Sequence, residues 1–357
     1  MITLSKNKAV LGLSGGVDST AAALLLKERG LEVTGFYFDV TGSNDAGRKA
    51  AEDLAGRLDI DFVSMNVAEE FEEKIISNFC REYACGRTPN PCIVCNPSIK
   101  FKKLLQVADE RGAYYIATGH YARVHSAGTE GPFFIRKGAS GRKDQSYMLY
   151  RLGQNVLSRL ILPLGDFEDK AVTRELARNY QMPNADAADS QEICFIDEKT
   201  EDYTDFLKRR GFLCKKGNFA DAQGNVLGQH QGISHYTVGQ RKGLGIALGR
   251  PVFVTAIDAE NNTVTLGDHA DLFSREVRSA DNFFAESGGN TPPDHLLRSR
   301  NLTAKIRYAS APSPVSLSQG ADGEITAVFE EPQRAAAPGQ SIVFYDGDIV
   351  VGGGFII

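Results

Sequence analysis

The sequence predicts an α/β protein in which a doubly wound parallel sheet is followed by a small central domain and a C-terminal β-barrel. Over the first half of the chain, apolar strand-like segments alternate with helix-like segments. This pattern favours a parallel sheet, because parallel neighbours are joined by crossover helices. Beyond about residue 200 the segments become short and β-rich, with Gly, Asn and Asp between them, which is typical of small β domains and barrels. At 357 residues, the chain is also too long for a single hydrophobic core.

The elements expected in the first half alternate regularly. A strand at Lys8–Leu13 leads into an alanine- and leucine-rich helix at Val17–Arg29. Strands at Leu31–Phe38, Ile60–Val67 and Tyr114–Thr118 and helices at Ala46–Leu58, Glu69–Tyr83 and Ser98–Arg111 follow. In the second half we expect strands in the segments PVFVTAID, NTVTLGD, ITAVFEE and QSIVFYDGDIVVGGG. Linkers near Asp197–Glu201 and Asp268–Phe273 would divide the chain into domains 1–198, 199–269 and 270–357.

Composition narrows the class of protein. No stretch approaches the roughly 20 apolar residues of a membrane span, and the N-terminus lacks the pattern of a signal peptide; we therefore expect a cytoplasmic protein without a membrane partner. The net charge of −5 argues mildly against nucleic acid, although local basic patches can still bind phosphates. In a cytosolic protein a disulfide framework is not expected, so the CxxC pair Cys92 and Cys95 indicates metal binding or thiol chemistry.

A glycine-rich turn stands at the start of the first helix, with the sequence Leu13-Ser14-Gly15-Gly16-Val17-Asp18-Ser19. Its glycines allow a tight turn, and the helix N-terminus favours anions. The two serine hydroxyls can reach phosphate oxygens, and Asp18 could hold Mg2+. The turn lacks the lysine of a Walker A motif. It resembles the PP-loop of N-type ATP pyrophosphatases, which adenylate a carbonyl or carboxyl oxygen and release pyrophosphate.

A proline-containing segment from Gly86 to Asn96 holds both cysteines of the CxxC pair. Prolines on either side of Asn90 disfavour helix there, so we expect both cysteines on a loop. Cys95 would lie just before the next helix, where the helix dipole would lower its pKa and favour the thiolate.

Further motifs follow at intervals to the end of the chain. They are Ala117–Arg123 (ATGHYAR), Lys143–Tyr147 (KDQSY), Asp189–Ile196 (DSQEICFI), Gly228–Gly232, Thr237–Gly245, Lys305–Tyr308, Pro338–Gln340 and Gly352–Gly354. In this order and spacing, and together with the PP-loop, they resemble the tRNA-specific 2-thiouridylase family essentially end to end.

The resemblance implies ATP-dependent 2-thiolation of a wobble uridine in tRNA, with tRNAs for Lys, Glu and Gln as the expected substrates. ATP, with Mg2+, would be bound by Gly12, Leu13, Ser14, Gly15, Gly16, Val17, Asp18, Ser19, Phe38 and Gly119. Cys194 would accept sulfur as a persulfide from a cysteine desulfurase or relay protein, and Cys95 would be the nucleophile that frees it. The target base would lie by Asn90, Pro91 and Cys92. Other tRNA contacts would come from His120, Lys143, Asp144 and Gln145, and from Arg307, Tyr308 and Gln340 in the barrel.

One position departs from the family pattern, because most members have aspartate where this chain has Cys92. A third thiol beside Cys95 and Cys194 leaves open a 4Fe–4S cluster that delivers sulfide directly. On the other interpretation, Cys92 only lines the base pocket. A PP-loop synthetase acting on a small molecule is the alternative of another class; it has no need of a loop cysteine with a distant partner.

Overall fold

The computed structural model describes residues 3–42, 45–129, 131–187, 193–197 and 199–357. The chain divides into two compact units. Unit 1 contains residues 1–74, 92–195 and 348–351, and unit 2 contains residues 75–91, 196–347 and 352–357. No helix among the described residues is long and apolar enough to cross a membrane.

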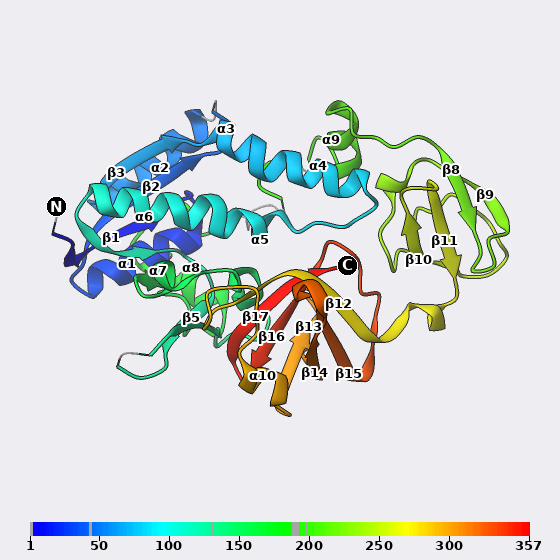
Figure 1. The fold of residues 1–357 in the computed structure, drawn as a ribbon. Coiled ribbons are helices and arrows are strands. Elements are labelled where there is room, and N and C mark those ends of the chain that lie inside the picture. Colours follow the sequence, from blue (N-terminus) through cyan, green and yellow to red (C-terminus); the bar gives the residue numbers. More distant parts are fainter. Residues whose placement is uncertain (1–2, 43–44, 130, 188–192, 198) are drawn as a thin grey trace. The chain divides into compact units, whose positions relative to one another are not determined.

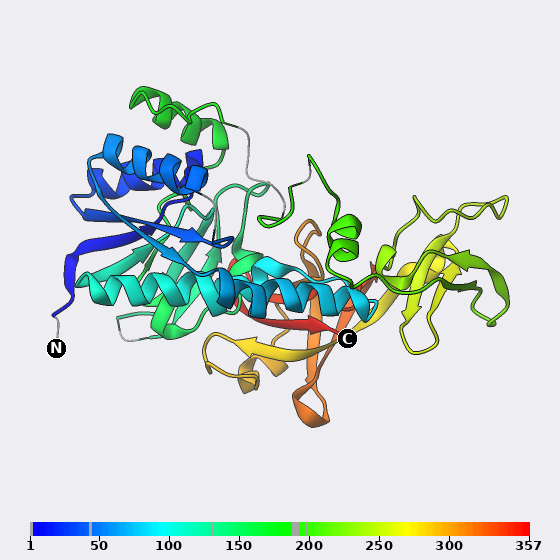
Figure 2. The same ribbon diagram turned by 90° about the horizontal axis from the view of Figure 1, so that it is seen from above.

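Unit 1 is built on a parallel sheet with the strand order β3-β2-β1-β4-β7 (Figure 1). The strands are β1 (Ser5–Gly12), β2 (Glu32–Asp39), β3 (Asp61–Asn66), β4 (Ala113–Ala117) and β7 (Leu160–Ile161). The chain moves outward from β1 to β3 and then returns to the other side of β1, so right-handed crossovers place helices on both faces. Figure 2 shows α1 (Val17–Glu28) and α2 (Asp45–Leu58) on one face and α6 (Phe101–Glu110) on the other. The predicted doubly wound sheet is therefore confirmed.

The core of this sheet depends on small residues in α1. Ala22 and Ala23 are fully buried and lie in one apolar cluster with Leu11 of β1 and Leu54 of α2. Their short side chains let the helix backbone lie close to the sheet. The remaining elements of unit 1 are α3 (Ala68–Phe71), α5 (Pro91–Cys95), a π-helix at Asn96–Lys100, β5 (Ala122–Ser126), β6 (Phe133–Lys137), a 3-10 helix at Ser146–Leu149, α7 (Gln154–Leu157) and α8 (Lys170–Asn179).

The helix predicted at Glu69–Tyr83 is present but interrupted. The chain forms α3, a π-helical turn at Glu72–Ile76 and then α4 (Ser77–Ala84). In unit 2, Tyr83 of α4 stacks on Tyr203 with ring centroids 4.8 Å apart. Phe79 packs edge-on against Phe206 of α9 (Tyr203–Arg209).

The first β part of unit 2 is a sheet with the order β10-β11-β8-β9. Its strands are β8 (Gly217–Ala220), β9 (Val226–His230), β10 (Phe253–Asp258) and β11 (Thr263–Gly267). His230 is buried in its core, where its ring nitrogens contact Asn262 O at 3.1 Å and Gly232 N at 3.0 Å. Short 3-10 helices lie at Ile233–His235 and His269–Leu272.

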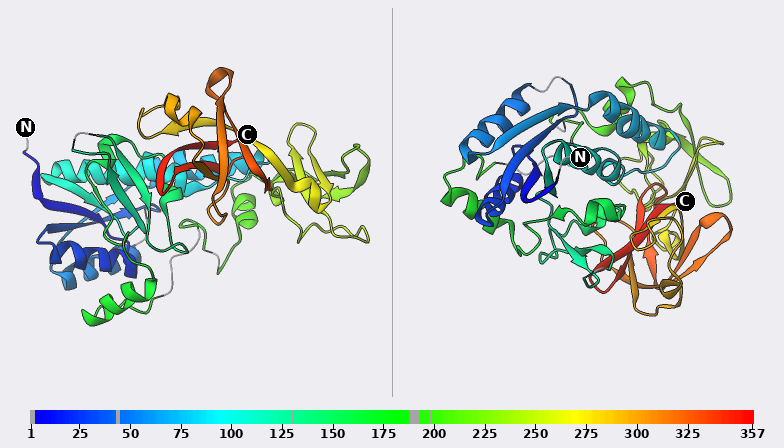
Figure 3. Two further views of the ribbon diagram at one scale, coloured as in Figure 1. Left: turned by 90° about the horizontal axis from the view of Figure 1, so that it is seen from below. Right: turned by 60° about the vertical axis from the view of Figure 1, so that its left-hand side comes forward.

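The C-terminal part of unit 2 closes into a barrel, as predicted. Its strands follow the order β12-β15-β14-β13-β16-β17, and β12 pairs again with β17. They are β12 (Phe273–Phe284), β13 (Leu302–Lys305), β14 (Ser313–Gln319), β15 (Ile325–Arg334), β16 (Ser341–Asp346) and β17 (Ile349–Ile356), with α10 (Asp294–Arg298) and a 3-10 helix at Ala321–Gly323 between them. Figure 3 shows these strands in yellow to red. Within the barrel, Phe284 and Phe344 are buried and stack with ring centroids 6.1 Å apart.

Candidate active site

The PP-loop lies between the end of β1 and the start of α1 and is shaped for an anion. Gly15 has φ of +83°, a left-handed conformation that glycine adopts without strain. The Ser19 hydroxyl donates to Gly16 O at 2.9 Å and so fixes the turn from inside. Among the described residues no side chain caps α1 at Gly16. The N–H groups of the first helical turn are therefore available to phosphate oxygens, and the helix dipole favours negative charge there.

Asp18, in the first turn of α1, lies in a network that the sequence did not reveal. Lys170 of α8 places its Nζ 2.9 Å from Asp18 Oδ2, and the Tyr121 hydroxyl donates to Asp18 Oδ1 at 2.8 Å. Tyr121 also contacts the Thr173 hydroxyl at 2.8 Å. The PP-loop has no lysine of its own, so Lys170 brings a cation to it from 152 residues away. The sequence signal was weak, because a lone lysine at the start of a helix has no distinguishing motif.

The loop is also held from the other end of α8. Asn184 follows that helix, and its Nδ2 donates to Gly15 O at 2.7 Å and to Thr20 Oγ1 at 2.8 Å. The carbonyl of Gly15 is thereby occupied by a side chain from beyond α8. Asn184 was not predicted as a site residue.

Phe38 and Gly119, both predicted to bind nucleotide, lie beside the PP-loop. A Cβ placed on Gly12 would lie 3.5 Å from the Phe38 ring, so this aromatic side chain borders the start of the loop. A Cβ on Gly119 would lie 2.9 Å from Asp18 O, so only glycine fits so close to the α1 backbone. The carboxyl ends of β1, β2 and β4 thus bring the predicted nucleotide residues together, as open α/β sheets do at their binding sites.

The CxxC pair lies on a helix, and the prediction of a loop was wrong. Pro91 begins α5, which ends at Cys95 and continues through the π-helix Asn96–Lys100 into α6. A proline at the first helical position is favoured, because its missing N–H would have no partner inside the helix. The two prolines predict a break in the helix, whereas Pro91 starts one.

The predicted lowering of the Cys95 pKa was also wrong. Cys95 is not at a free helix N-terminus, and burial of its thiol raises the pKa above the usual range. The ammonium and the backbone N–H of Lys100 act in the opposite direction, and the neighbouring Cys92 adds to the increase. In this structure desolvation outweighs the positive charge.

Cys194 lies close enough to the CxxC pair for the thiols to act on one another. The residue as a whole is exposed, but protein atoms crowd its thiol, and this burial raises the pKa of Cys194 to about 12. Charge on Cys95 and on Cys92 raises it further, while Lys100 lowers it. The structure therefore assembles Cys92, Cys95 and Cys194, although the sequence separates them widely. Within the motif Asp189–Ile196, positions 189–192 lie outside the described residues.

His120 lies at the end of β4 and is neutral. Its Nδ1 is 2.7 Å from Thr118 Oγ1, and its ring stacks on Phe101 with centroids 6.1 Å apart. Burial, followed by the charge of Lys100, holds its pKa well below the usual value. At neutral pH the imidazole can therefore donate or accept a hydrogen bond but carries no charge.

The segment Lys143–Gln145 is held by its own side chains. Asp144 is buried and accepts hydrogen bonds from Gly138 N at 3.0 Å and from the Ser146 hydroxyl at 2.8 Å. Gln145 Oε1 accepts from Tyr121 N at 2.9 Å. These two side chains fix the loop that carries Lys143.

The other predicted tRNA residues belong to unit 2. Gln340 Nε2 donates to Thr88 O at 2.9 Å, which anchors the chain just before Asn90 and Pro91. Arg307 and Tyr308 follow β13 and are half-buried. The ammonium of Lys305 lies 5.7 Å from the Tyr308 ring centroid.

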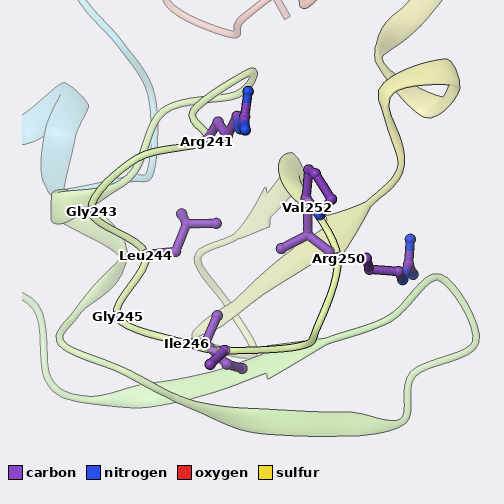
Figure 4. A pocket seen from close by; sticks show the side chains of 9 residues that line it. Arg241, Gly243, Leu244, Gly245, Ile246, Arg250 and Val252 are labelled. Carbon is purple, nitrogen blue, oxygen red and sulfur yellow. The ribbon is translucent and has the colours of Figure 1, made fainter.

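Unit 2 also contains a cavity of about 420 Å³ within the loop 241–252 (Figure 4). Leu244, Ile246 and Val252 supply apolar walls, and the same residues pack against the core of the β8–β11 sheet. Arg241 and Arg250 lie on its rim, and Arg250 pairs with Asp268. The described residues that line the cavity include no cysteine, histidine or carboxylate.

Three family models match successive parts of the chain. The model described as the tRNA methyl transferase HUP domain matches residues 7–198, more than half of the chain. The tRNA methyl transferase PRC-barrel domain matches residues 204–268, and the aminomethyltransferase beta-barrel domain matches residues 290–356.

Relatives that match this chain along nearly its whole length carry the same name. The tRNA-specific 2-thiouridylase MnmA of Clostridioides difficile is 43% identical, with 98% of each chain covered. The protein of the same name from Carboxydothermus hydrogenoformans is 44% identical over 100% of this chain and 99% of the relative. The protein of the same name from Acetivibrio thermocellus is 42% identical, over 99% of this chain and 100% of the relative. With identity of this extent along its entire length, the chain belongs to the tRNA-specific 2-thiouridylase family.

Proposed function

We propose that this protein is an ATP-dependent tRNA-uridine 2-sulfurtransferase, which replaces the 2-oxygen of a wobble uridine with sulfur. One observation carries the proposal: unit 1 holds both a PP-loop and a cluster of thiols that includes Cys95 and Cys194. The family model names methyl transfer, but these two features suit activation by ATP followed by sulfur transfer. The relatives' names agree with that chemistry.

The first step is adenylation at the PP-loop. A uridine 2-carbonyl is a poor electrophile, because expelling oxide from carbon is unfavourable. Attack of the 2-oxygen on the α-phosphorus of ATP forms an O–P bond, breaks the bond to pyrophosphate and turns the oxygen into a good leaving group. Residues 12–19 bind the phosphates, with Phe38 and Gly119 bordering the nucleotide. Mg2+ would screen the phosphate charge, and Lys170 beside Asp18 adds a protein cation at the same place.

The second step is sulfur transfer through the two thiols. A persulfide on Cys194 attacks C2 with its terminal sulfur, and AMP leaves with the former 2-oxygen. The thiolate of Cys95 then attacks Sγ of Cys194 and breaks the sulfur–sulfur bond, which leaves the thiocarbonyl on the uridine and a Cys95–Cys194 disulfide. The two cysteines supply two electrons, which an external thiol reductant must return. A cysteine desulfurase or relay protein supplies the next persulfide.

The tRNA must present the wobble base outside the anticodon stack for these steps. We assign the base pocket to Asn90, Pro91 and Cys92, with tRNAs for Lys, Glu and Gln as substrates. Further contacts are proposed for His120, Lys143, Asp144 and Gln145 and for Arg307, Tyr308 and Gln340. In this division residues 1–198 perform the chemistry, and residues 199–269 and 270–357 bind tRNA.

A 4Fe–4S cluster on Cys92, Cys95 and Cys194 fits the structure poorly. Among the described residues there is no group of three cysteine, histidine or carboxylate side chains arranged to hold a metal. Cys92 and Cys95 stand one turn apart and share a helix face, but among the described residues Cys194 does not complete a group of three ligands with them. We therefore derive no step through a cluster.

The decisive experiment combines ATP, unmodified tRNA and a persulfide donor and measures thiolated uridine together with pyrophosphate. We expect pyrophosphate release to depend on tRNA, and Cys95→Ser and Cys194→Ser to abolish thiolation while retaining adenylation. Cys80→Ser, at a buried cysteine of unit 2, is the control and should keep both activities. Pyrophosphate release that does not depend on tRNA would instead favour a small-molecule synthetase.

A further inference from the structure

Lys100 occupies a distinctive place on the helix that carries the CxxC pair. It ends the π-helical turn Asn96–Lys100, which immediately follows Cys95. A π-helix joins residues five apart, so Lys100 returns to the helix face that bears Cys95. Its backbone N–H contributes a hydrogen bond to the Cys95 thiol.

The ammonium of Lys100 has no carboxylate partner among the described residues, in contrast to its neighbours. Lys103 lies 2.6 Å and Lys102 3.6 Å from the carboxylate of Glu70, which also pairs with Lys74 at 2.7 Å. Lys100 is half-buried, and its charge lies near enough to act on the thiols of Cys95 and Cys194 and on the ring of His120. His120 is neutral, and the thiols are neutral when protonated. A half-buried cation without a counter-ion is unfavourable unless an anion joins it.

We propose that Lys100 and the two thiols form an anion subsite that binds the sulfur being transferred in its anionic form, as thiolate, persulfide or hydrosulfide. The inference rests on the proposed function and assigns to Lys100 a role that the motifs did not suggest. Lys100 is a positioning residue here, because its side chain acts on the transferred sulfur through its charge.

The subsite explains how a buried thiol pair can perform the transfer. When the Cys95 thiolate attacks Sγ of Cys194, negative charge moves from one sulfur to the next. A fixed ammonium facing both positions stabilises that charge throughout, without reorganisation of solvent. Without Lys100, each anionic sulfur would form in a desolvated place with no compensating charge.

The test uses a pair of alkylating reagents that differ in charge. Iodoacetate is an anion and iodoacetamide is neutral, and the ratio of their rate constants at Cys95 reports the local potential. The ratio is measured by mass spectrometry on full-length protein without ATP, tRNA or a sulfur donor. Lys100→Gln removes the charge, and Lys100→Arg keeps it. Lys102→Gln, two residues away on the same helical run, is the matched control.

We expect Lys100→Gln to lower the iodoacetate-to-iodoacetamide ratio about fivefold, as for one unit charge at a partly buried site. Lys100→Arg and Lys102→Gln should keep the wild-type ratio. In the wild type, raising the salt concentration should lower the ratio, which tests the charge even if Lys100→Gln does not fold. An unchanged ratio in folded Lys100→Gln, or an equal fall in Lys102→Gln, would overturn the proposal.

The result of the alkylation test can be separated from the proposed function. A protein that never thiolates tRNA but whose ratio falls in Lys100→Gln retains the anion subsite and loses the sulfurtransferase assignment. A protein that thiolates tRNA normally in Lys100→Gln, with an unchanged ratio, retains the function and loses the subsite. In the combined assay Lys100→Gln should lower kcat for thiolation and leave the KM for ATP unchanged.

Discussion

Replacing Lys170 with methionine should reduce both the stability of unit 1 and its affinity for ATP. Lys170 is the cation beside Asp18, and its side chain is only 13% exposed, against 31% for Asp18. Methionine keeps most of the apolar volume of lysine and removes the charge. The carboxylate of Asp18 then retains the Tyr121 hydroxyl as a partner but has no counter-ion.

The expected loss of stability follows from the burial of the Lys170–Asp18 ion pair. At 2.9 Å the gross attraction is about 6 kcal/mol with an effective dielectric constant of about 20, and desolvation of the two ions offsets most of it. Because Asp18 keeps partial access to water, we expect a loss of about 2 kcal/mol, below the roughly 3–5 kcal/mol of a fully buried pair. An unneutralised carboxylate next to the phosphates should also weaken ATP binding by about tenfold, or about 1.4 kcal/mol.

Urea denaturation measures the first effect and equilibrium binding of ATP the second. The control is Lys8→Met, which breaks the exposed pair with Glu32 at almost the same distance, 2.8 Å, and should cost below about 1 kcal/mol. In Lys170→Met the second substitution Asp18→Asn should recover part of the lost stability, because the unpaired charge is gone. Equal losses in Lys170→Met and Lys8→Met, with ATP binding unchanged, would refute the view that Lys170 completes the PP-loop.

Three further substitutions or measurements address the loop and the thiols. Gly15→Ala should cost about 1–2 kcal/mol in urea denaturation and slow pyrophosphate release, because an L-residue is strained at φ of +83°. Apart from its chain neighbours, no described residue has an atom within 4 Å of the added Cβ, so unchanged stability would exclude backbone strain. Cys92→Ser should keep thiolation near the wild-type rate if sulfur travels as a persulfide. The iron content of the purified protein is measured alongside thiolation, and loss of both in Cys92→Ser would establish a cluster. Burial raises the pKa of Cys194 to about 12, so its alkylation by iodoacetamide should accelerate steadily from pH 7 to pH 11; a plateau below pH 9 would contradict the burial.

The parallel sheet can be predicted from the sequence, because the patterns that identify its strands and helices lie within short stretches of the chain. The strand at Lys8–Leu13 and the helix at Val17–Arg29 differ from β1 and α1 by three residues at most. The position of the PP-loop follows directly, since it joins these two elements. The same holds for Gly119, which follows β4 at the same edge of the sheet.

The partners of the site could not be predicted, because they come from distant parts of the chain. Lys170 and Asn184 reach the PP-loop only after α8 packs on α1, and neither carries a recognisable pattern. The loop expected for Cys92 and Cys95 failed for a local reason, because Pro91 can break a helix or begin one. The sign of the Cys95 pKa shift depends on burial, which spacing along the chain does not reveal.

Burial raises the pKa values of the Cys95 and Cys194 thiols, and the charge of Lys100 lowers them. These opposing effects suit a sulfur carrier. A Cys194 thiol with a pKa of about 12 stays protonated at neutral pH, and a protonated thiol is slow to oxidise or to react with other electrophiles. A persulfide is a stronger acid than the corresponding thiol, so loading Cys194 moves its ionisation toward neutral pH in the same surroundings. At Cys194, Lys100 then acts on an anion that forms only after loading. The environment thus keeps the empty carrier inert and makes the loaded carrier nucleophilic, which ties sulfur transfer to the arrival of sulfur.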